Sequence, residues 1–417
     1  MASAQTLLGL VSRTAAWPQR VEAWTSAGQL PVLVSYCQSA AHLQARLRSD
    51  QGTTVALLDG DLSFVDRDLL AGIAADGGVA VVIEGPRRQR DWVELGASHV
   101  LPVDFDQRQL LRAVGTNSPS VAPSPPGRSV APMIAVTGPG GTGASVTAVA
   151  VAQGLAADRR RVLLADCCLH AEQAMLHNAH GAQPCLTDVI ELHAHRTPER
   201  RQVRQLALGI VERGYYLLPG IPRARHWSRV GTGSFQSALQ SLRTAFDAVV
   251  IDVDADVEGE AEGGSIEVEE RNVLARTVLS AADAVLVVGQ PTMKGVYALV
   301  RVMIDLLEFG VRPQRLLAVV NQAGASDTAR AELSRAVRHL IDGVTGGRAV
   351  GPVLFAPRVA LEERLRERDA VPDSWSSLLA DATAVVLDRS GGGGEANGPV
   401  RVTAGALGHW DGPDTPG

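Results

Sequence analysis

The chain has 417 residues, a length typical of two or three domains, and 46% of its residues are hydrophobic. Its 45 acidic residues outnumber the 39 basic ones, and the net charge of −6 argues against non-specific binding of the whole chain to DNA. No apolar run reaches the ~18 residues of a membrane span, and no leader-type segment opens the sequence. We therefore expect a cytoplasmic protein that contacts membranes through partners. Its four cysteines lack metal-type spacing, which is typical of reduced thiols.

Two segments are rich in Pro, Ser and Gly and show no periodicity. They predict a linker over 116–131 and an unstructured tail over 390–417. Two folded units remain, at 1–115 and 132–389.

The first unit alternates short apolar runs with helical segments. This order favours a doubly wound parallel α/β sheet. The predicted strands are Leu7–Val11, Pro31–Ser35, Val55–Asp59, Val79–Ile83 and His99–Pro102. The pattern resembles a response-regulator receiver domain, with Asp59 at the phosphoacceptor position. Ser12 and Arg13 replace the acidic pair that holds Mg²⁺ in receivers, and Leu101 replaces the lysine. The negative charge that develops during phosphoryl transfer would therefore be uncompensated. The resemblance implies a pseudo-receiver used for protein interaction.

A glycine-rich loop follows the apolar run 133–136 and precedes a helix predicted over 146–157. It matches the phosphate-binding pattern G-x-x-x-x-G-K-[ST] at Gly138, Gly143 and Ser145, but Ala144 stands where the lysine belongs. Backbone N–H groups at a helix N-terminus still form an anion-binding nest. The missing charge is worth on the order of 4 kcal/mol at ~4 Å and an effective dielectric of about 20. The predicted nucleotide-binding residues of this loop are Gly138, Gly140, Gly141, Thr142, Gly143, Ala144, Ser145 and Val146.

The replacement of the lysine is not explained by composition. Lys294 is the only lysine, so 38 of the 39 basic residues are arginines. Drift in composition would have placed an arginine at 144, and the alanine there indicates a tolerated or selected loss.

Two further apolar runs end in aspartates. Asp252 ends the run 246–252, which predicts a Walker B strand whose carboxylate faces the phosphate crevice and holds a water on Mg²⁺. Ser145 would place its hydroxyl on the same ion. Asp166 ends the run 161–166, a predicted strand beside the strand of the glycine-rich loop.

In chain order, these motifs resemble those of the MinD/ParA ATPases over most of 132–389. The resemblance implies a second doubly wound parallel-sheet domain, of the P-loop NTPase kind. The resemblance implies ATP and Mg²⁺ as cofactors and a homodimer. It implies catalytic roles for Asp252 and Asp166, the latter being the first aspartate of an Asp-x-Asp motif whose second position is Cys168. It also matches Asn321 with the asparagine that contacts the adenine edge.

The order pseudo-receiver, linker and loop ending Gly-Ala-Ser resembles the CpaE/TadZ group of pilus-assembly localisation proteins and their septum-site-determining relatives. The signature lysine of that group, which reaches the nucleotide of the partner subunit, is Pro139 here. The resemblance implies pilus, secretion or cell-division proteins as partners and recruitment by them to the pole, the septum or the inner membrane.

Three functions remain open. The first is an ATP-binding positioning protein with weak or absent hydrolysis, and the second is a nucleotide-free scaffold. The third, a ligase on the same fold, is disfavoured because such enzymes use the loop lysine. If an arginine or lysine replaces the lost charges, Lys294 and Arg223 are the first candidates. The acidic segment 254–270 predicts a solvated loop, with a partner-docking loop as the alternative.

Overall fold

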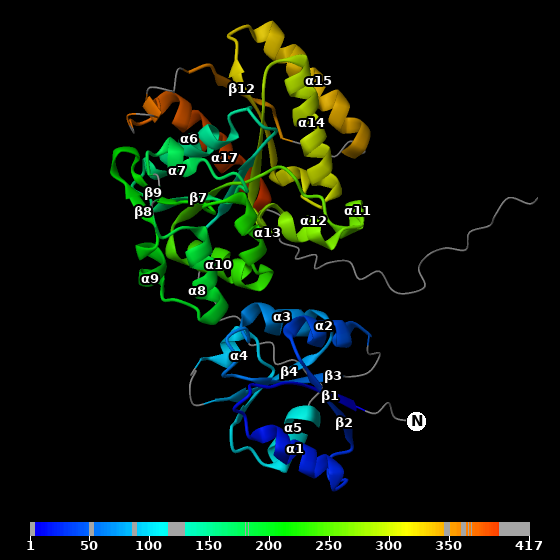
Figure 1. Cartoon of the computed structure of the whole chain (residues 1–417). Helices are drawn as coiled ribbons and strands as arrows, with labels where there is room; N and C mark the ends of the chain where they lie inside the picture. The colour runs from blue at the N-terminus through cyan, green and yellow to red at the C-terminus, as the bar shows by residue number, and fades with distance from the viewer. Residues whose placement is uncertain are drawn as a thin grey trace, which may run out of the picture.

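The protein forms two α/β units (Figure 1). The computed structural model describes residues 5–49, 54–85, 90–115, 130–179, 181, 183–345, 351–359, 364–365, 367 and 369–391. Most of the predicted linker and tail lie outside these ranges. The predicted fold class, two doubly wound parallel-sheet units, is confirmed. None of the helices in the described ranges combines the length and hydrophobicity of a membrane span.

The N-terminal unit is a five-stranded parallel sheet in the order β2-β1-β3-β4-β5. This is the flavodoxin-like order, in which the chain reverses direction across the sheet at β1 and β3. Its elements are β1 (Gln5–Leu10), α1 (Trp17–Ser26), β2 (Val32–Cys37), α2 (Ala40–Ser49), β3 (Thr54–Asp59), α3 (Arg67–Ala75), β4 (Val79–Glu84), α4 (Trp92–Leu95), β5 (His99–Pro102) and α5 (Gln107–Gly115).

Alternation along the strands divides the core of this unit into two layers. Successive strand residues point to opposite faces, so Leu7 packs under α1 and α5 while Leu8 packs under α2, α3 and α4. Asp59 is 4% exposed and its carboxylate accepts hydrogen bonds from the N–H groups of Ser12 and Asp61 at 3.1 and 3.0 Å. In this structure the aspartate therefore ties the loops at the carboxyl edge of the sheet together.

The C-terminal unit is an eight-stranded sheet in the order β13-β12-β11-β6-β10-β7-β9-β8. All neighbouring pairs are parallel except β8 with β9. Its elements are β6 (Met133–Thr137), α6 (Ala144–Ala156), β7 (Val162–Asp166), α7 (Gln173–Leu176), α8 (Leu186–His195), α9 (Arg200–Gln205), β8 (Leu208–Ile210), β9 (Tyr215–Leu218), α10 (Thr232–Ala245), β10 (Ala248–Asp252), α11 (Glu260–Gly263), α12 (Ile266–Arg271), α13 (Val273–Ala281), β11 (Ala284–Gly289), α14 (Met293–Glu308), β12 (Leu316–Ala323), α15 (Asp327–Thr345), β13 (Leu354–Pro357) and α17 (Asp373–Gly391).

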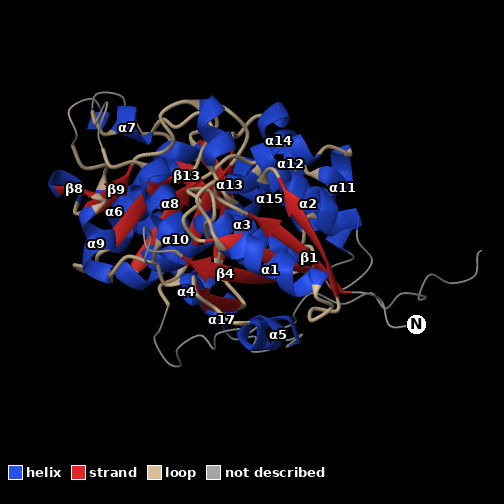
Figure 2. Ribbon diagram, turned by 60° about the horizontal axis from the view of Figure 1, so that its bottom comes forward, coloured by secondary structure: helices blue, strands red, loops and turns tan. Residues whose placement is uncertain are grey.

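Helices enclose both faces of this sheet (Figure 2). Helices α6 and α17 cover one face, and α8, α10, α13, α14 and α15 cover the other. The contact between α6 and α17 is close, since a Cβ at Gly154 would lie 2.2 Å from the carbonyl oxygen of Ser376. The central strands β6, β10 and β11 are buried on both faces, which explains their continuous apolar sequences.

Helix α3 of the N-terminal unit joins the C-terminal unit through two consecutive charged residues. The Asp68 carboxylate accepts hydrogen bonds from the N–H group, at 2.9 Å, and the hydroxyl of Ser234, in the first turn of α10. Arg67 donates to the carbonyl oxygen of His193, at the end of α8, and to the hydroxyl of Thr197. A carboxylate thus meets a helix N-terminus and a guanidinium meets a helix C-terminus, the arrangement that helix dipoles favour.

The acidic segment 254–270 differs from the predicted solvated loop. Residues 260–263 form α11, and the segment continues into α12, where the hydroxyl of Ser265 caps the helix by accepting from the N–H group of Val268. The Ser cap and the acidic residues of the first turn stabilise this helix start. Two other details were not predicted: the antiparallel edge strand β8, and the start of α6 at Ala144 rather than two residues later.

Candidate nucleotide-binding site

The glycine-rich loop lies at the carboxyl end of β6, near the middle of the sheet, between β10 and β11. The chain leaves β6 through α6 and returns as β7, on the far side of β10. Ligands of doubly wound sheets bind at such points, outside the carboxyl ends of the strands.

Three of the four loop glycines are required by the fold itself. A Cβ at Gly138 would lie 2.3 Å from the carbonyl oxygen of Val288, and Gly143 has a φ of +87° with Asn321 Nδ2 only 2.5 Å from its Cβ position. Gly141 has a φ of +77°. Gly140 differs, because its Cβ position is open to 4 Å and its φ is not positive. Its open surroundings leave room for a ligand against the backbone.

Helix α6 begins directly behind the loop and presents a free N-terminus. Its first N–H groups have no partner within the helix, and no side chain of the described residues caps them. Thr142, a predicted ligand, is 5% exposed and its N–H and hydroxyl both bond to the carbonyl oxygen of Pro139. Its side chain therefore shapes the loop. What the loop offers an anion is the row of N–H donors from Gly143 to Ser145 and into the half-buried Val146.

Two amide side chains brace this loop from the neighbouring strands. Asn321 is 7% exposed and donates from Nδ2 to the carbonyl oxygen of Thr142 at 3.0 Å, while its Oδ1 accepts from the N–H of Gln322. Gln290 donates to the carbonyl oxygen of Gly141 at 2.8 Å. Both polar ends of Asn321 are thus engaged within the protein. The predicted contact of Asn321 with adenine stays a prediction.

Asp166 and Asp252 lie side by side at the carboxyl ends of β7 and β10. They are register partners, and their exposed fractions are 0% and 1%. Burial is the main cause that raises the pKa of each carboxyl, and the proximity of Asp252 raises the pKa of Asp166 further. Hydrogen bonds from Gln173 and from the hydroxyl of Ser145 oppose the shift at Asp252. Two buried carboxyls with raised pKa values form a site that a cation would stabilise.

Cys168 completes a group of three possible metal ligands with these aspartates. One ligand atom of each lies within 4.8 Å of the others. Burial raises the pKa of the Cys168 thiol, and the carboxylates raise it further, so the sulfur stays protonated. Mg²⁺ requires oxygen ligands. The side chains here therefore fit a Mg²⁺ held by Asp252 and Ser145, with Asp166 adjacent and with no carboxylate from position 168.

A cleft of about 510 Å³ opens beside the loop at Pro139 and Gly140. The arginines lining it are Arg271 of α12 and Arg301 of α14, both exposed, and its acidic residues include Asp254 and Asp256. The cations proposed from the sequence are placed differently: Lys294 and Arg223 are exposed and do not line this cleft in the described part of the chain. Positive charge near the loop thus comes from Arg271 and Arg301, which belong to none of the sequence motifs.

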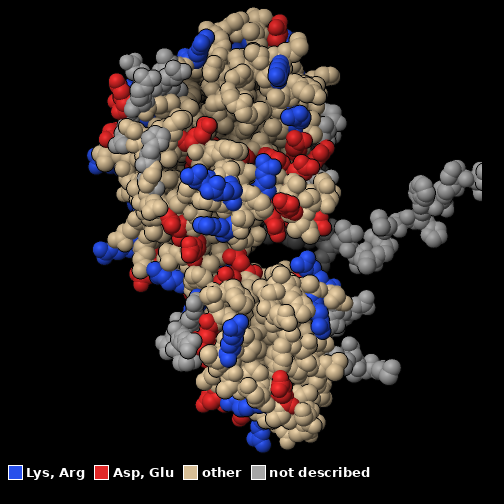
Figure 3. Space-filling view, viewed as in Figure 1, with Lys and Arg blue, Asp and Glu red and all other residues tan. Residues whose placement is uncertain are grey.

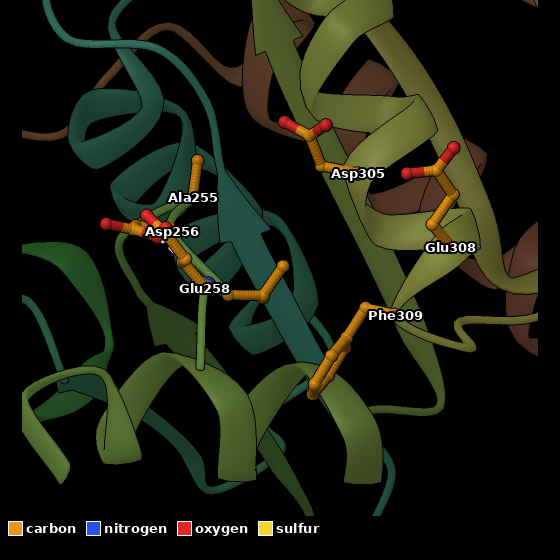
Figure 4. A pocket seen from close by; sticks show the side chains of 7 residues that line it. Ala255, Asp256, Glu258, Asp305, Glu308 and Phe309 are labelled. Carbon is orange, nitrogen blue, oxygen red and sulfur yellow. Dashed lines mark hydrogen bonds between the residues drawn. The ribbon is translucent and has the colours of Figure 1, made fainter. Parts of the chain in front are cut away.

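A second cavity, of about 380 Å³, adjoins the first and shares Ala255, Asp256 and Asp305 with it. Figure 4 shows Asp305 and Glu308 on one side, Asp256 and Glu258 on the other, and the Phe309 ring between the two sides at the base. Burial raises the pKa of Asp305, and Arg301 lowers it. Figure 3 shows both acidic and basic side chains on this unit, with several basic ones near its middle.

Some residues of the site are not marked by any sequence motif. Gln173, Arg271 and Arg301 reach it only through the fold. A glutamine seven residues after Asp166 carries no recognisable signal, and arginines are too common in this chain to be informative. Of the predicted residues, the structure brings the loop, Asp166, Asp252 and Asn321 together at one edge of the sheet.

No family model matches the sequence, and no curated protein matches it. Solved structures do resemble the C-terminal part. A ParA family ATPase from Chlorobium tepidum aligns over 62% of this chain and 98% of its own, at 17% identity and a TM-score of 0.44. The cell-division ATPase MinD from Pyrococcus furiosus aligns over 60% of this chain and 97% of its own, at 20% identity and a TM-score of 0.44. The septum-site-determining protein MinD from Pyrococcus horikoshii, complexed with Mg-ADP, aligns over 63% of this chain and 95% of its own, at 16% identity and a TM-score of 0.43.

Proposed function

We propose that the chain is a MinD/ParA-like ATP-binding protein that binds nucleotide without significant hydrolysis and uses the bound state to position other proteins. The observation that carries this proposal is a complete backbone anion site whose cationic side chains are missing. The loop, the free N-terminus of α6 and the buried pair Asp166 and Asp252 lie together, while positions 139 and 144 offer no charge.

Different groups of the site bind the phosphates and the cation. The N–H groups of 143–146 hold the phosphates, and the hydroxyl of Ser145 with the carboxylate of Asp252 holds the accompanying Mg²⁺. The ion supplies charge neutralisation of the phosphates when bound. Arg271 and Arg301 add positive charge at the edge of the cleft beside the loop. A missing lysine weakens binding by about two to three decades, so we expect a dissociation constant in the micromolar to millimolar range.

Calorimetric titration of the full chain with ATP·Mg²⁺ tests this proposal. Wild type should give saturable heat that Ser145→Ala and Asp252→Asn weaken. Gly140→Ala should also weaken binding while leaving the unfolding temperature unchanged, because its methyl group meets nothing within 4 Å in the fold. Gly209→Ala, equally open but remote in β8, is the matched control. Absence of heat at millimolar ATP·Mg²⁺ would contradict the proposal.

The second candidate function is a nucleotide-free scaffold. One observation favours it: the amide of Gln173 bridges the carbonyl oxygen of Ser145 and the carboxylate of Asp252, so the protein satisfies part of the site by itself. The calorimetric result separates the two functions, because a scaffold gives no saturable heat.

The proposal extends to assembly. On the resemblance to the CpaE/TadZ group, we propose a homodimer whose receiver-like unit engages pilus, secretion or cell-division proteins. The engagement of the Asp59 carboxylate by backbone N–H groups supports a role in interaction instead of phosphoryl transfer. Sedimentation velocity with and without ATP·Mg²⁺ tests the dimer, which should be enriched by nucleotide. An unchanged monomer at saturating nucleotide would contradict it.

A further inference from the structure

One residue, Gln173, contacts three parts of the candidate site at once. It begins α7 and its side chain is 0% exposed. Its Nε2 donates to Asp252 Oδ2 at 2.7 Å and to the carbonyl oxygen of Ser145 at 2.9 Å, and its backbone N–H donates to Asp166 Oδ2 at 2.9 Å.

The orientation of the Gln173 amide is fixed by these contacts. Both neighbours of the amide nitrogen, at Ser145 and Asp252, are acceptors, so the nitrogen must face them and the oxygen must face away. The oxygen, Oε1, is buried and has no hydrogen-bond partner in the part of the chain that the structure describes. An unsatisfied buried acceptor costs about 1–3 kcal/mol. An unsatisfied buried oxygen of this kind indicates that a ligand or ion binds next to it.

The backbone of Gln173 is also held in place. The carbonyl oxygen of Gln173 can only accept, so His177 Nδ1, at 2.7 Å, donates to it. In the neutral ring, His177 Nε2 then accepts from the hydroxyl of Tyr215 on β9, at 2.6 Å. Burial raises the pKa of Tyr215 to about 12, which keeps this hydroxyl protonated. Hydrogen bonds at the backbone and at the amide nitrogen of Gln173 therefore fix the position of its unsatisfied oxygen.

The unsatisfied oxygen lies close to the proposed cation ligands. Amide bond lengths bring Oε1 within about 5 Å of Asp252 Oδ2, given the 2.7 Å contact of the nitrogen. Two oxygens on opposite sides of a Mg²⁺ lie about 4 Å apart. The amide oxygen and the Asp252 carboxylate can thus serve one ion with small side-chain movement.

We propose that Oε1 of Gln173 is an oxygen contact of the divalent cation that accompanies a bound nucleotide, replacing the carboxylate that position 168 lacks. The inference rests on the proposed ATP binding. Cys168 offers sulfur, which Mg²⁺ does not favour, whereas an amide carbonyl is an oxygen ligand of the required kind. Because the amide is neutral, it supports the cation without adding a third negative charge to Asp166 and Asp252.

The test compares ATP affinity with Mg²⁺ and with EDTA, measured by calorimetry on the full chain. The dissociation constant in EDTA divided by that in Mg²⁺ gives the metal dependence of binding, and a larger ratio means stronger dependence. Gln173→Ala should lower this ratio about ten- to a hundred-fold, the usual effect of losing a partner that supports a metal. Gln290→Ala is the matched control, since Gln290 also donates one amide hydrogen bond to the loop but contacts neither aspartate in the described chain. It should leave the ratio unchanged.

Gln173→Glu keeps the inference testable if Gln173→Ala fails to fold. The carboxylate adds a charged oxygen ligand, so the ratio should rise above that of wild type. An unchanged ratio in a folded Gln173→Ala, or an unchanged or lower ratio in Gln173→Glu, overturns this inference and leaves ATP binding intact. Absence of ATP heat from wild type in both buffers overturns the proposed function and this inference with it.

Discussion

At the scale of single residues, the site combines retained and lost groups in a way that separates binding from turnover. In the function proposed above, the loop backbone, Ser145 and Asp252 hold the nucleotide and its cation. On the resemblance to the MinD/ParA ATPases, the groups that would stabilise charge during hydrolysis are replaced here, by Pro139 and Ala144 for cations and by Cys168 for a carboxylate. Phosphoryl transfer depends almost wholly on such positioning and charge stabilisation.

Phosphate release by the purified chain should therefore be close to background. Each lost electrostatic contact costs about 10²–10³ in rate, and at least two are missing. The measurement compares wild type with Asp166→Ala, and the two should not differ. Turnover by wild type well above that of Asp166→Ala would show that another cation, with Arg271 and Arg301 the nearest candidates in the cleft, has replaced the lysines.

At the scale of elements, the packing of α6 decides how rigidly the loop is held. This helix carries the loop at its N-terminus and packs on α17, and its Gln153 exchanges two hydrogen bonds with the backbone of Val371 at 2.8 Å each. Nine of its thirteen residues are buried, so the loop is supported by a fixed core element.

Gly154→Ala should destabilise the C-terminal unit. Alanine gains about 1 kcal/mol of helix propensity, but its Cβ would lie 2.2 Å from the rigid backbone oxygen of Ser376, and such overlap costs about 1–3 kcal/mol or more. Differential scanning calorimetry should show a drop in Tm of about 2–4 °C per kcal/mol lost. Gly72→Ala, in α3, is the control, because only the end of the flexible Gln44 side chain is near. A Gly154→Ala protein as stable as wild type would contradict the packing.

The strands and the order of the elements could be predicted from the sequence, whereas several contacts could not. Continuous apolar runs such as 133–136 mark strands buried on both faces, and the glycine pattern marks the loop between strand and helix. The short strand β8 has only three residues and depends on its pairing with β9. The roles of Gln173 and Asn321 arise from tertiary contacts over 79 and 179 residues, which no local pattern records.

At the scale of the whole molecule, hydrogen bonds at the ends of two helices join the two units. Asp68 acts as the cap that α10 lacks, since its own N-cap residue is Gly231 with no side chain. Helix α10 leads directly into β10, the strand that ends in Asp252. The N-terminal unit is thereby connected to the candidate nucleotide-binding site through one helix and one strand.

Asp68→Ala should loosen the start of α10. Loss of an N-cap costs about 0.5–2 kcal/mol, so the amides of the first turn should exchange about two- to thirty-fold faster. Hydrogen–deuterium exchange of peptides covering 231–240 measures this. Asp104→Ala, which removes an exposed carboxylate from the same unit, is the matched control and should change nothing there. Equal exchange in both variants would show that the contact does not hold the units together.

The most direct test of the central claim restores the missing charge. Calorimetry with ATP·Mg²⁺ should show that Ala144→Lys binds about two to three decades more tightly than wild type, since the regained interaction is worth on the order of 4 kcal/mol. Ala144→Met, of similar length and without charge, separates the effect of charge from that of bulk and should bind no better than wild type. A clear gain limited to the lysine variant is the predicted result. An Ala144→Lys protein that binds ATP no more tightly than wild type would contradict the claim that the anion site has lost only its cation. Absence of ATP binding by both proteins would contradict it as well.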